Sequence, residues 1–351
     1  GPRRPPGSEV NPAMAPAAPT NPPRRLVLLG SDEIALPAFR AVAALPDVVI
    51  VAVYSQPDRP AGRGQEIQPN PVTAWARAAG HVVRQPERLG PEHAAELAAA
   101  GVDLGVVMAY GQILKDDFLA APRRGLVNFH GSPLPALRGA TPIEGALAAG
   151  WTTTGVSLQQ VVRRLDAGPL HATATLAILP NEGRAALRAR LGELAGRLAA
   201  TALPEVLAGR SLPCPQDESA ATFTRRLTRA DAALDFGVAA ETLAARIRAL
   251  EGWPGSTFEQ AGVVLKVGAA AAEAGVVAAA PGSILSADRG GVRVACGDGV
   301  LVLSRLQRPG GKMLPVGEFL SGHPLTPGEV LPSVAMPALV GAVPFPRSPK
   351  A

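Results

Sequence analysis

Short apolar runs alternate with stretches of helical spacing along the first half of the chain. Runs rich in Val, Leu and Ile, with the length and composition of buried strands, lie at 26–30, 48–55, 104–110 and 125–130. Apolar residues recur with helical spacing at 36–45, 72–80, 91–101 and 141–150. Strands that alternate with helices predict an α/β fold with a Rossmann-like parallel sheet and helices on both of its faces.

The alternation breaks down in the second half of the chain. Two β-like runs at 155–162 and 170–179 indicate a strand pair, and 184–209 indicates one long amphipathic helix. Periodicity is then lost over 210–222, which is typical of a linker.

A different pattern follows the linker. After a predicted helix, short β-like runs separated by glycine-containing turns lie at 255–260, 262–270, 282–287, 291–297 and 299–307. Several short strands at this spacing predict a C-terminal OB-like β-barrel domain. The Ala-rich segment 268–282 is low in complexity, and we expect a loop there.

The 351 residues are too many for one ordinary domain, and the pattern shows where the chain divides. We predict a disordered tail, an α/β domain, a linker, a barrel domain and a second tail, at 1–24, 25–209, 210–222, 223–335 and 336–351. The first tail lacks the apolar core of a secretion signal. The sequence contains no apolar run long enough to cross a membrane.

Composition adds modest information about partners and location. Hydrophobic residues make up 47% of the chain and charged residues 18%, enough to bury a sizeable core. The net charge of +5 favours an anionic partner, but charge of this size does not by itself define a nucleic-acid binder. Cys214 and Cys296 are far apart and form no disulfide framework, which favours a cytoplasmic location.

Two polar residues close the apolar run at 125–130. Asn128 and His130 lie where a strand gives way to a turn, and ligands of parallel sheets bind beyond the carboxyl ends of strands. Residues two apart on a strand point to the same face. An amide and an imidazole can therefore converge on one oxygen, such as the oxyanion of an acyl transfer. The plainer alternative is that both side chains bind nearby backbone.

A carboxylate that could orient the imidazole lies further along the chain. Asp166 occupies a turn-like Leu-Asp-Ala-Gly between the runs at 155–162 and 170–179. It could hold the ring of His130 and favour its charged form, or it could serve only as a turn residue.

Other chemistries find little support in the sequence. The five histidines are scattered, which argues against a bound metal: His81, His93, His130, His171 and His323. The stretch after the first strand is not G-x-G-x-x-G, and 308–314 lacks the frame of a P-loop. A G-x-S-x-G nucleophile elbow is also absent from the sequence.

These stretches together resemble the folate-dependent formyltransferases. The resemblance is carried by "NFHGSPLP" at 128–135, "RGATPI" at 138–143 and "LDAG" at 165–168. Two more, "SQPDRPAGRGQ" at 55–65 and "VVMAYGQIL" at 106–114, together with C-terminal blocks, are similar to the methionyl-tRNA branch of that family. The resemblance covers about residues 25–330.

The resemblance implies a reaction and roles for residues. The formyl group of 10-formyltetrahydrofolate would move to the α-amino group of methionyl initiator tRNA, for the initiation of translation. Asn128 and His130 would bind the formyl oxygen, while Asp166 would orient His130 and help to relay the amine proton. The enzyme would be a cytoplasmic monomer without a metal, with 25–209 as its catalytic domain and 223–335 as its tRNA-binding domain.

The resemblance also implies binding residues. Folate would be held by two stretches, with these members: Ala109, Tyr110, Gly111, Ile113, Ser132, Pro133, Leu134 and Pro135. Arg59 and Arg63, in the Pro- and Gly-containing loop 56–64, would contact the tRNA, because arginine can fork onto phosphate. Basic residues of the barrel domain would together add phosphate contacts, although most of them taken singly are ordinary surface charges: Arg225, Arg226, Arg229, Arg246, Arg248, Lys266 and Arg308.

Two rival functions stay open at this point. A related enzyme could formylate a nucleotide-linked amino sugar, and a catalytically idle RNA-binding module could share the scaffold. The arginine-bearing loop and the barrel disfavour the first, and the Asn, His and Asp set disfavours the second. Pro133, Val162, Arg163 and Arg164 depart from the family pattern, which affects the folate loop rather than the class of reaction.

Overall fold

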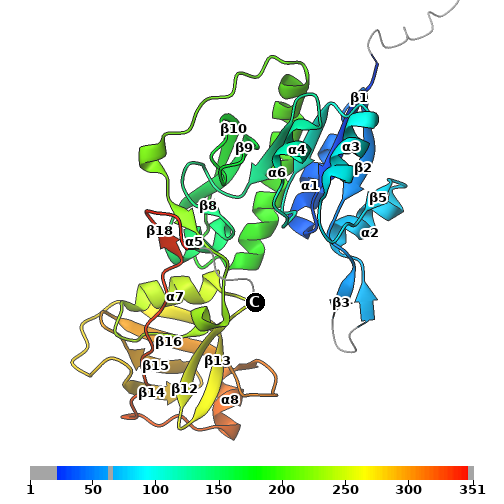
Figure 1. Cartoon of the computed structure of the whole chain (residues 1–351). Coiled ribbons are helices and arrows are strands. Elements are labelled where there is room, and N and C mark those ends of the chain that lie inside the picture. The colour runs from blue at the N-terminus through cyan, green and yellow to red at the C-terminus, as the bar shows by residue number, and fades with distance from the viewer. Residues whose placement is uncertain (1–21, 62–65, 347–351) are drawn as a thin grey trace, which may run out of the picture.

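The computed structural model of the protein describes residues 22–61 and 66–346. Most of the predicted disordered tail, Arg63 and the last five residues therefore lie outside the described residues. Figure 1 shows two parts, one built on a twisted sheet flanked by helices and one built on a β-sheet, which meet at helices α5 (Pro142–Ala148) and α7 (Ala240–Ala249).

The first part is built on a seven-stranded sheet. Its strands, in spatial order, are β10 (Leu170–Ala177), β9 (Thr153–Gln160), β7 (Leu126–His130), β6 (Leu104–Val107), β1 (Arg24–Leu29), β2 (Val48–Tyr54) and β5 (Val83–Arg84). Strands β5, β2, β1, β6 and β7 run parallel, whereas β9 is antiparallel to both β7 and β10. The predicted sheet and strand pair are confirmed, with β9 as the reversed strand.

Helices cover both faces of this sheet, as predicted. Alternate strand residues, including Leu28 and Phe129, pack with α1 (Leu36–Ala43), α2 (Pro71–Ala78) and α6 (Arg184–Leu207). The intervening residues, including Leu29 and Tyr54, pack with α3 (Pro91–Ala99) and α4 (Asp116–Ala120). Because successive strand residues point to opposite faces, burial of both faces requires nearly continuous apolar strands, and the sequence has them.

The direction of strand order reverses at β1, which lies between β2 and β6. Such a switch point leaves a crevice beyond the carboxyl ends of two neighbouring strands. Gly30 follows β1, and a Cβ at this residue would lie 2.7 Å from the carbonyl oxygen of Met108, which follows β6. Glycine thus lets the segments beyond β1 and β6 approach closely, and Ser31 N donates to Ala109 O over 3.1 Å.

The second part is an antiparallel β domain. Its strands are β12 (Ser256–Gln260), β13 (Val263–Glu273), β16 (Val300–Gln307), β15 (Gly291–Ala295) and β14 (Ile284–Asp288) in spatial order, with β17 (Leu314–Pro315) on β16. The order from β13 to β14 is a Greek key, which suits the predicted OB-like domain. Helix α7 and α8 (Val316–Gly322) pack against this sheet around a separate apolar core.

The loop predicted for 268–282 is only partly correct. Ala269–Glu273 continue β13 and pair with Val300–Arg305 of β16. Alanine has a low strand propensity, so composition indicated a loop, but pairing along the long β16 overrides that preference.

Several short elements bring distant segments together. Strands β3 (Arg59–Ala61) and β4 (Glu66–Gln68) form a hairpin in the loop that carries Arg59. A three-stranded sheet joins β8 (Arg138–Gly139), β11 (Phe223–Thr224) and β18 (Val340–Gly341), in the order β18-β11-β8. Figure 1 shows β18 beside β8 and α5, at the junction of the two parts. No helix among the described residues is long and apolar enough to span a membrane.

Candidate active site

The polar residues of β7 lie on the sheet face opposite α6. Val127 and Phe129 belong to the core that packs on α6, so Asn128 and His130 point the other way. On the neighbouring strand β9, Gln159 pairs with Asn128 and Ser157 pairs with His130. Four polar side chains therefore line one face where β7 ends.

The imidazole of His130 is buried between two oxygen atoms. Its Nε2 lies 2.9 Å from the carbonyl oxygen of Leu137, and a carbonyl only accepts, so Nε2 carries a proton. Its Nδ1 lies 3.7 Å from Asp166 Oδ2. This second distance is too long for a hydrogen bond. Nδ1 is therefore the ring nitrogen that is available to hydrogen-bond a ligand.

Asp166 is held in place by backbone and side-chain donors. Its φ of +46° lies in the left-handed region, which a non-glycine residue adopts only when the surroundings fix it. Gly139 N donates to Asp166 Oδ2 over 2.9 Å, and Gln159 Nε2 donates to Oδ1 over 2.9 Å. The structure thus brings His130 and Asp166 together from β7 and the bend after β9.

Asn128 is half-buried beside this pair. Within the described chain its side-chain amide makes no hydrogen bond, which leaves its N–H groups able to donate to a ligand oxygen.

Gln159 is a site residue that the sequence reading did not identify. It is 2% exposed, it binds Asp166, and its Oε1 is buried without a hydrogen-bond partner among the described residues. A buried acceptor left in this state is destabilising unless something donates to it. Alternation along 155–162 was the available signal, because it places Gln159 on the face that Asn128 also occupies.

The predicted folate loop after β6 has an unusual backbone. Ala109 has a φ of +51° and Gly111 a φ of +86°, and the Ile113 side chain is 81% exposed. Tyr110 turns its ring into the core, where burial raises the pKa of its hydroxyl. Only its backbone faces the loop, and Tyr110 O accepts from Gln56 Nε2 over 3.0 Å. The exposed apolar side chain can pack on one face of a flat heterocycle, and the polar backbone groups of the bent segment can hydrogen-bond to its edge.

The predicted residues after β7 divide into internal and partly exposed ones. Ser132 is fully buried and its hydroxyl donates to Ala136 O over 2.6 Å. Leu134 is buried, and its N–H donates to Ser157 Oγ over 3.0 Å. The side chains of Ser132 and Leu134 therefore shape the turn, and Pro133 and Pro135 are the partly exposed members.

The arginine-bearing loop projects from the sheet. Arg59 is exposed and pairs with Glu87 over 3.1 Å. Asp58, at the base of the loop, accepts from Arg77 and Gln85. Arg63 lies outside the described residues.

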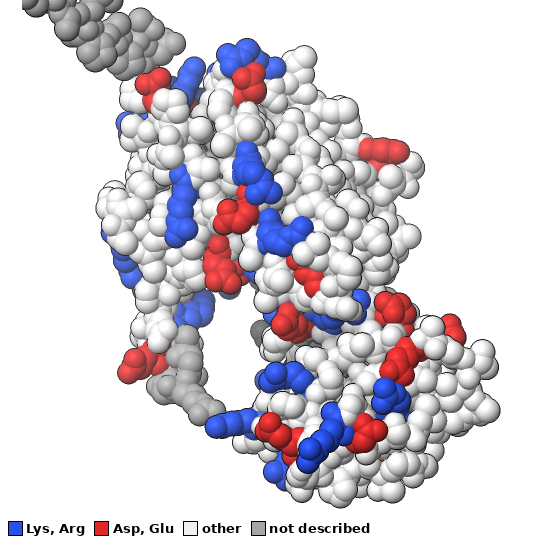
Figure 2. All heavy atoms as spheres, turned by 180° about the vertical axis from the view of Figure 1, so that it is seen from behind, with Lys and Arg blue, Asp and Glu red and all other residues white. Residues whose placement is uncertain are grey.

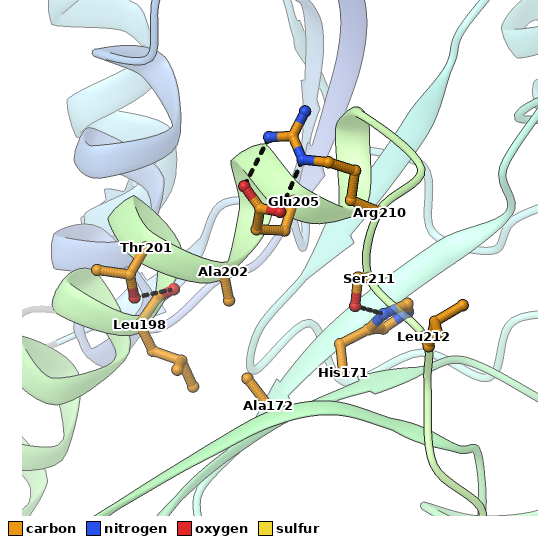
Figure 3. A pocket seen from close by; sticks show the side chains of 9 residues that line it. All are labelled: His171, Ala172, Leu198, Thr201, Ala202, Glu205, Arg210, Ser211 and Leu212. Atoms are coloured by element: carbon orange, nitrogen blue, oxygen red, sulfur yellow. Dashed lines mark hydrogen bonds and ion pairs between the residues drawn. The ribbon is translucent and has the colours of Figure 1, made fainter.

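A separate shallow pocket of about 370 Å³ lies on the α6 side of the sheet, away from His130. His171 and Ser211 form one wall, and Glu205 and Arg210 form an ion pair at its edge (Figure 3). These side-chain polar groups bind one another, so the pocket presents little unmet hydrogen-bonding capacity. Across 22–61 and 66–346, no group of three His, Cys, Asp or Glu side chains could hold a metal ion.

Comparison with known proteins decides the family. A model of the formyl transferase family matches residues 38–206, and a model of the formyl transferase C-terminal domain matches 226–324. The chain belongs to the formyl transferase family. Methionyl-tRNA formyltransferases from Halorhodospira halophila and Myxococcus xanthus are each 41% identical to it, over 87% of this chain and 98% and 97% of theirs.

Two solved structures with bound folates share the fold. An N-formyltransferase from Helicobacter canadensis, in complex with folinic acid and dTDP-3-aminofucose, matches with a TM-score of 0.62 at 14% identity. The match covers 83% of this chain and all of that one. HypX from Aquifex aeolicus, in complex with tetrahydrofolic acid, matches with a TM-score of 0.55 at 17% identity, over 90% of this chain and 51% of that one.

Proposed function

We propose that the protein transfers the formyl group of 10-formyltetrahydrofolate to the α-amino group of methionyl initiator tRNA. The observation that carries this proposal is likeness to methionyl-tRNA formyltransferases at 41% identity over nearly the whole length of both chains. The amino-sugar alternative is supported by structures at 14% identity, which share the fold alone.

The arrangement of Asn128, His130 and Asp166 supports a mechanism for this reaction. The amine nitrogen attacks the formyl carbon, and the formyl oxygen takes up negative charge as the new C–N bond forms. The Asn128 amide and the Nδ1–H of His130 donate to that oxygen, and Asp166, 3.7 Å from Nδ1, stabilises the charged ring.

The second half of the reaction breaks the bond between the formyl carbon and N10 of the folate. The amine gives up one proton and N10 takes one up, so the reaction consumes no net proton. Asp166 is the nearby base that we propose for this relay, and Gln159 Nε2 holds its Oδ1 over 2.9 Å. The exposed Ile113 and the backbone at Ala109 and Gly111 would bind the pterin.

Basic side chains in both parts are candidates for contact with tRNA phosphates. Figure 2 shows Lys and Arg on both parts of the back face, with Asp and Glu among them. Among the barrel-domain candidates, Arg226, Arg229, Lys266 and Arg308 are exposed. Arg246 is 6% exposed, and Arg225 pairs with Asp231 over 2.6 Å, so these two hold the fold instead.

We propose that the division of labour follows the predicted boundaries. We assign catalysis to 25–209 and tRNA binding to 223–335, joined by the linker 210–222. We place the enzyme in the cytoplasm as a monomer, in keeping with its free cysteines Cys214 and Cys296.

A single-turnover transfer assay tests the proposal. Formyl transfer from 10-formyltetrahydrofolate to methionyl-tRNA is measured for the wild type and for His130→Ala, with dTDP-linked amino sugar as the competing acceptor. We expect transfer to tRNA and at least a ~100-fold slower rate in His130→Ala, the scale of a lost oxyanion donor or general acid–base group. Transfer to the sugar alone would support the amino-sugar enzyme, and no transfer to either would support the idle module.

A further inference from the structure

The linker contributes side chains to the surroundings of the catalytic groups. Gln216 Nε2 donates to the carbonyl oxygens of Asp166 and Gly168, over 2.8 and 2.7 Å. Its Oε1 accepts from Arg138 Nε and Nη2, over 3.1 and 2.7 Å. One amide from the linker thus ties the bend that carries Asp166 to the loop after β7.

A second linker residue acts on the His130 side. Thr222 Oγ1 accepts from Leu137 N over 2.8 Å, and Thr222 O accepts from Arg138 N over 2.8 Å. Leu137 O is the acceptor that holds His130 Nε2. Thr222 therefore fixes both peptide groups that flank the Cα of Leu137: its carbonyl binds the peptide whose oxygen holds the imidazole, and its hydroxyl binds the peptide before it.

Strand β11 continues this contact along the backbone. Gly139 pairs with Thr224, and the N–H of Gly139 donates to Asp166. A Cβ at Gly139 would lie 2.3 Å from Thr224 O, and its φ of +112° favours glycine. Close contact between β8 and β11 thus depends on this glycine.

A buried arginine anchors the same segment. Arg138 is 1% exposed, and its guanidinium donates to Glu218 Oε1 and Oε2 over 2.9 and 3.0 Å. These bonds lower the pKa of the Glu218 carboxyl, and Arg164 from the Asp166 bend pairs with the same carboxylate. The linker thereby binds both loops of the site through side chains as well as backbone.

We propose that Gln216 and Thr222 are positioning residues for Asp166 and His130. Gln216 holds the left-handed backbone of Asp166. The hydroxyl of Thr222 holds the N–H of Leu137, the residue whose carbonyl accepts from His130 Nε2. The inference rests on the proposed function, because it concerns the same two catalytic groups. The linker thus serves the chemical step in addition to joining the two parts.

The test compares Gln216→Ala, Thr222→Val and Thr222→Ser with the wild type in full-length protein. We expect Gln216→Ala and Thr222→Val to lower the single-turnover rate by about 10- to 100-fold, the scale of a small misplacement of reacting groups. The KM for tRNA should stay within about twofold, because binding in the ground state is unchanged. Thr222→Ser keeps the hydroxyl and should retain at least about half of the wild-type rate.

Gln260→Ala is the matched control. This glutamine also joins two segments, His323 and Glu329, through its amide, but it lies in the β domain. Its rate should equal that of the wild type, with thermal unfolding recorded for every variant.

Several results would overturn the positioning roles. They are equal losses in Thr222→Ser and Thr222→Val, an equal loss in Gln260→Ala, or a raised KM for tRNA with an unchanged rate. Wild-type rates in Gln216→Ala and Thr222→Val, alongside an inactive His130→Ala, would refute the positioning roles and leave the function intact. An active His130→Ala would instead refute the proposed mechanism itself.

Discussion

Replacing Asp166 by Asn separates the charge of this residue from its hydrogen bonds. Asp166 accepts from Gly139 N and from Gln159 Nε2. An asparagine oxygen can keep the bond from Gly139, and its new N–H₂ group would face Gln159. Gln159 can rotate its amide by half a turn, so that its Oε1, now without a partner among the described residues, accepts from the asparagine.

These hydrogen bonds and the lost charge set the expected changes in stability and in transfer rate for Asp166→Asn. Because the exchange leaves the number of buried polar atoms without a partner unchanged, the free energy of unfolding should change by less than about 1 kcal/mol. The carboxylate charge lies 3.7 Å from His130 Nδ1. At an effective dielectric constant of about 20, a unit-charge pair at that range is worth about 4 kcal/mol, or about 1000-fold in rate as an upper bound. We expect a loss between about 100- and 1000-fold.

The measurement is single-turnover formyl transfer to methionyl-tRNA, with urea unfolding of the same preparations. Asp166→Ala serves as the comparison, because it leaves the donors of Gly139 and Gln159 without an acceptor and should destabilise the protein by about 1–3 kcal/mol for each donor. A folded Asp166→Asn enzyme that works within about threefold of the wild-type rate would show that the carboxylate charge has no part in the chemistry.

Four further predictions concern other parts of the molecule. Arg59→Ala should weaken tRNA binding and reduce the slope of log affinity against log salt concentration by about one unit. An unchanged slope would show that Arg59 does not contact a phosphate. Asp231→Ala removes the partner of Arg225 in a buried pair and should lower the free energy of unfolding by about 3–5 kcal/mol in urea, whereas a loss below about 1 kcal/mol would contradict the pairing. Burial lowers the pKa of His171 below 6.5, so the neutral ring stabilises the fold above that pH and the contribution is lost as pH falls through the lowered value; an NMR titration midpoint at or above 6.5 would disprove it. A chain that ends at Ala335 lacks β18 and the carbonyl of Ala338 that Arg225 binds, and should melt at a lower temperature than the full chain; equal melting temperatures would show that the contact is dispensable.

The fold was largely predictable from the sequence because its strands are apolar and its helices end at glycines. The runs at 26–30 and 104–110 contain the paired strands β1 and β6, where a buried parallel sheet demands apolar residues on both faces. The extension of β13 into 268–273 was not predictable, because alanine gives no strand signal and the pairing partner lies about thirty residues away in sequence.

The candidate site was predictable only in part. The approach of Asp166 to His130 was suggested by their place at strand ends. The distance of 3.7 Å between His130 Nδ1 and Asp166 Oδ2 comes from the structure alone. The roles of Gln216 and Thr222 carried no signal, since a stretch without periodicity says nothing about where its side chains bind. The buried state of Arg138 was equally hidden, because arginine is usually exposed.

The sheet β18-β11-β8 draws one strand from each of three separate stretches of the chain. The two parts of the chain therefore cannot be exchanged independently between relatives without disturbing this sheet. A chimaera that kept residues up to 209 and took everything later from a distant relative would retain the catalytic side chains without the scaffolding that holds them. Laboratory recombination of such enzymes should place its crossovers elsewhere, in segments that β8 does not touch.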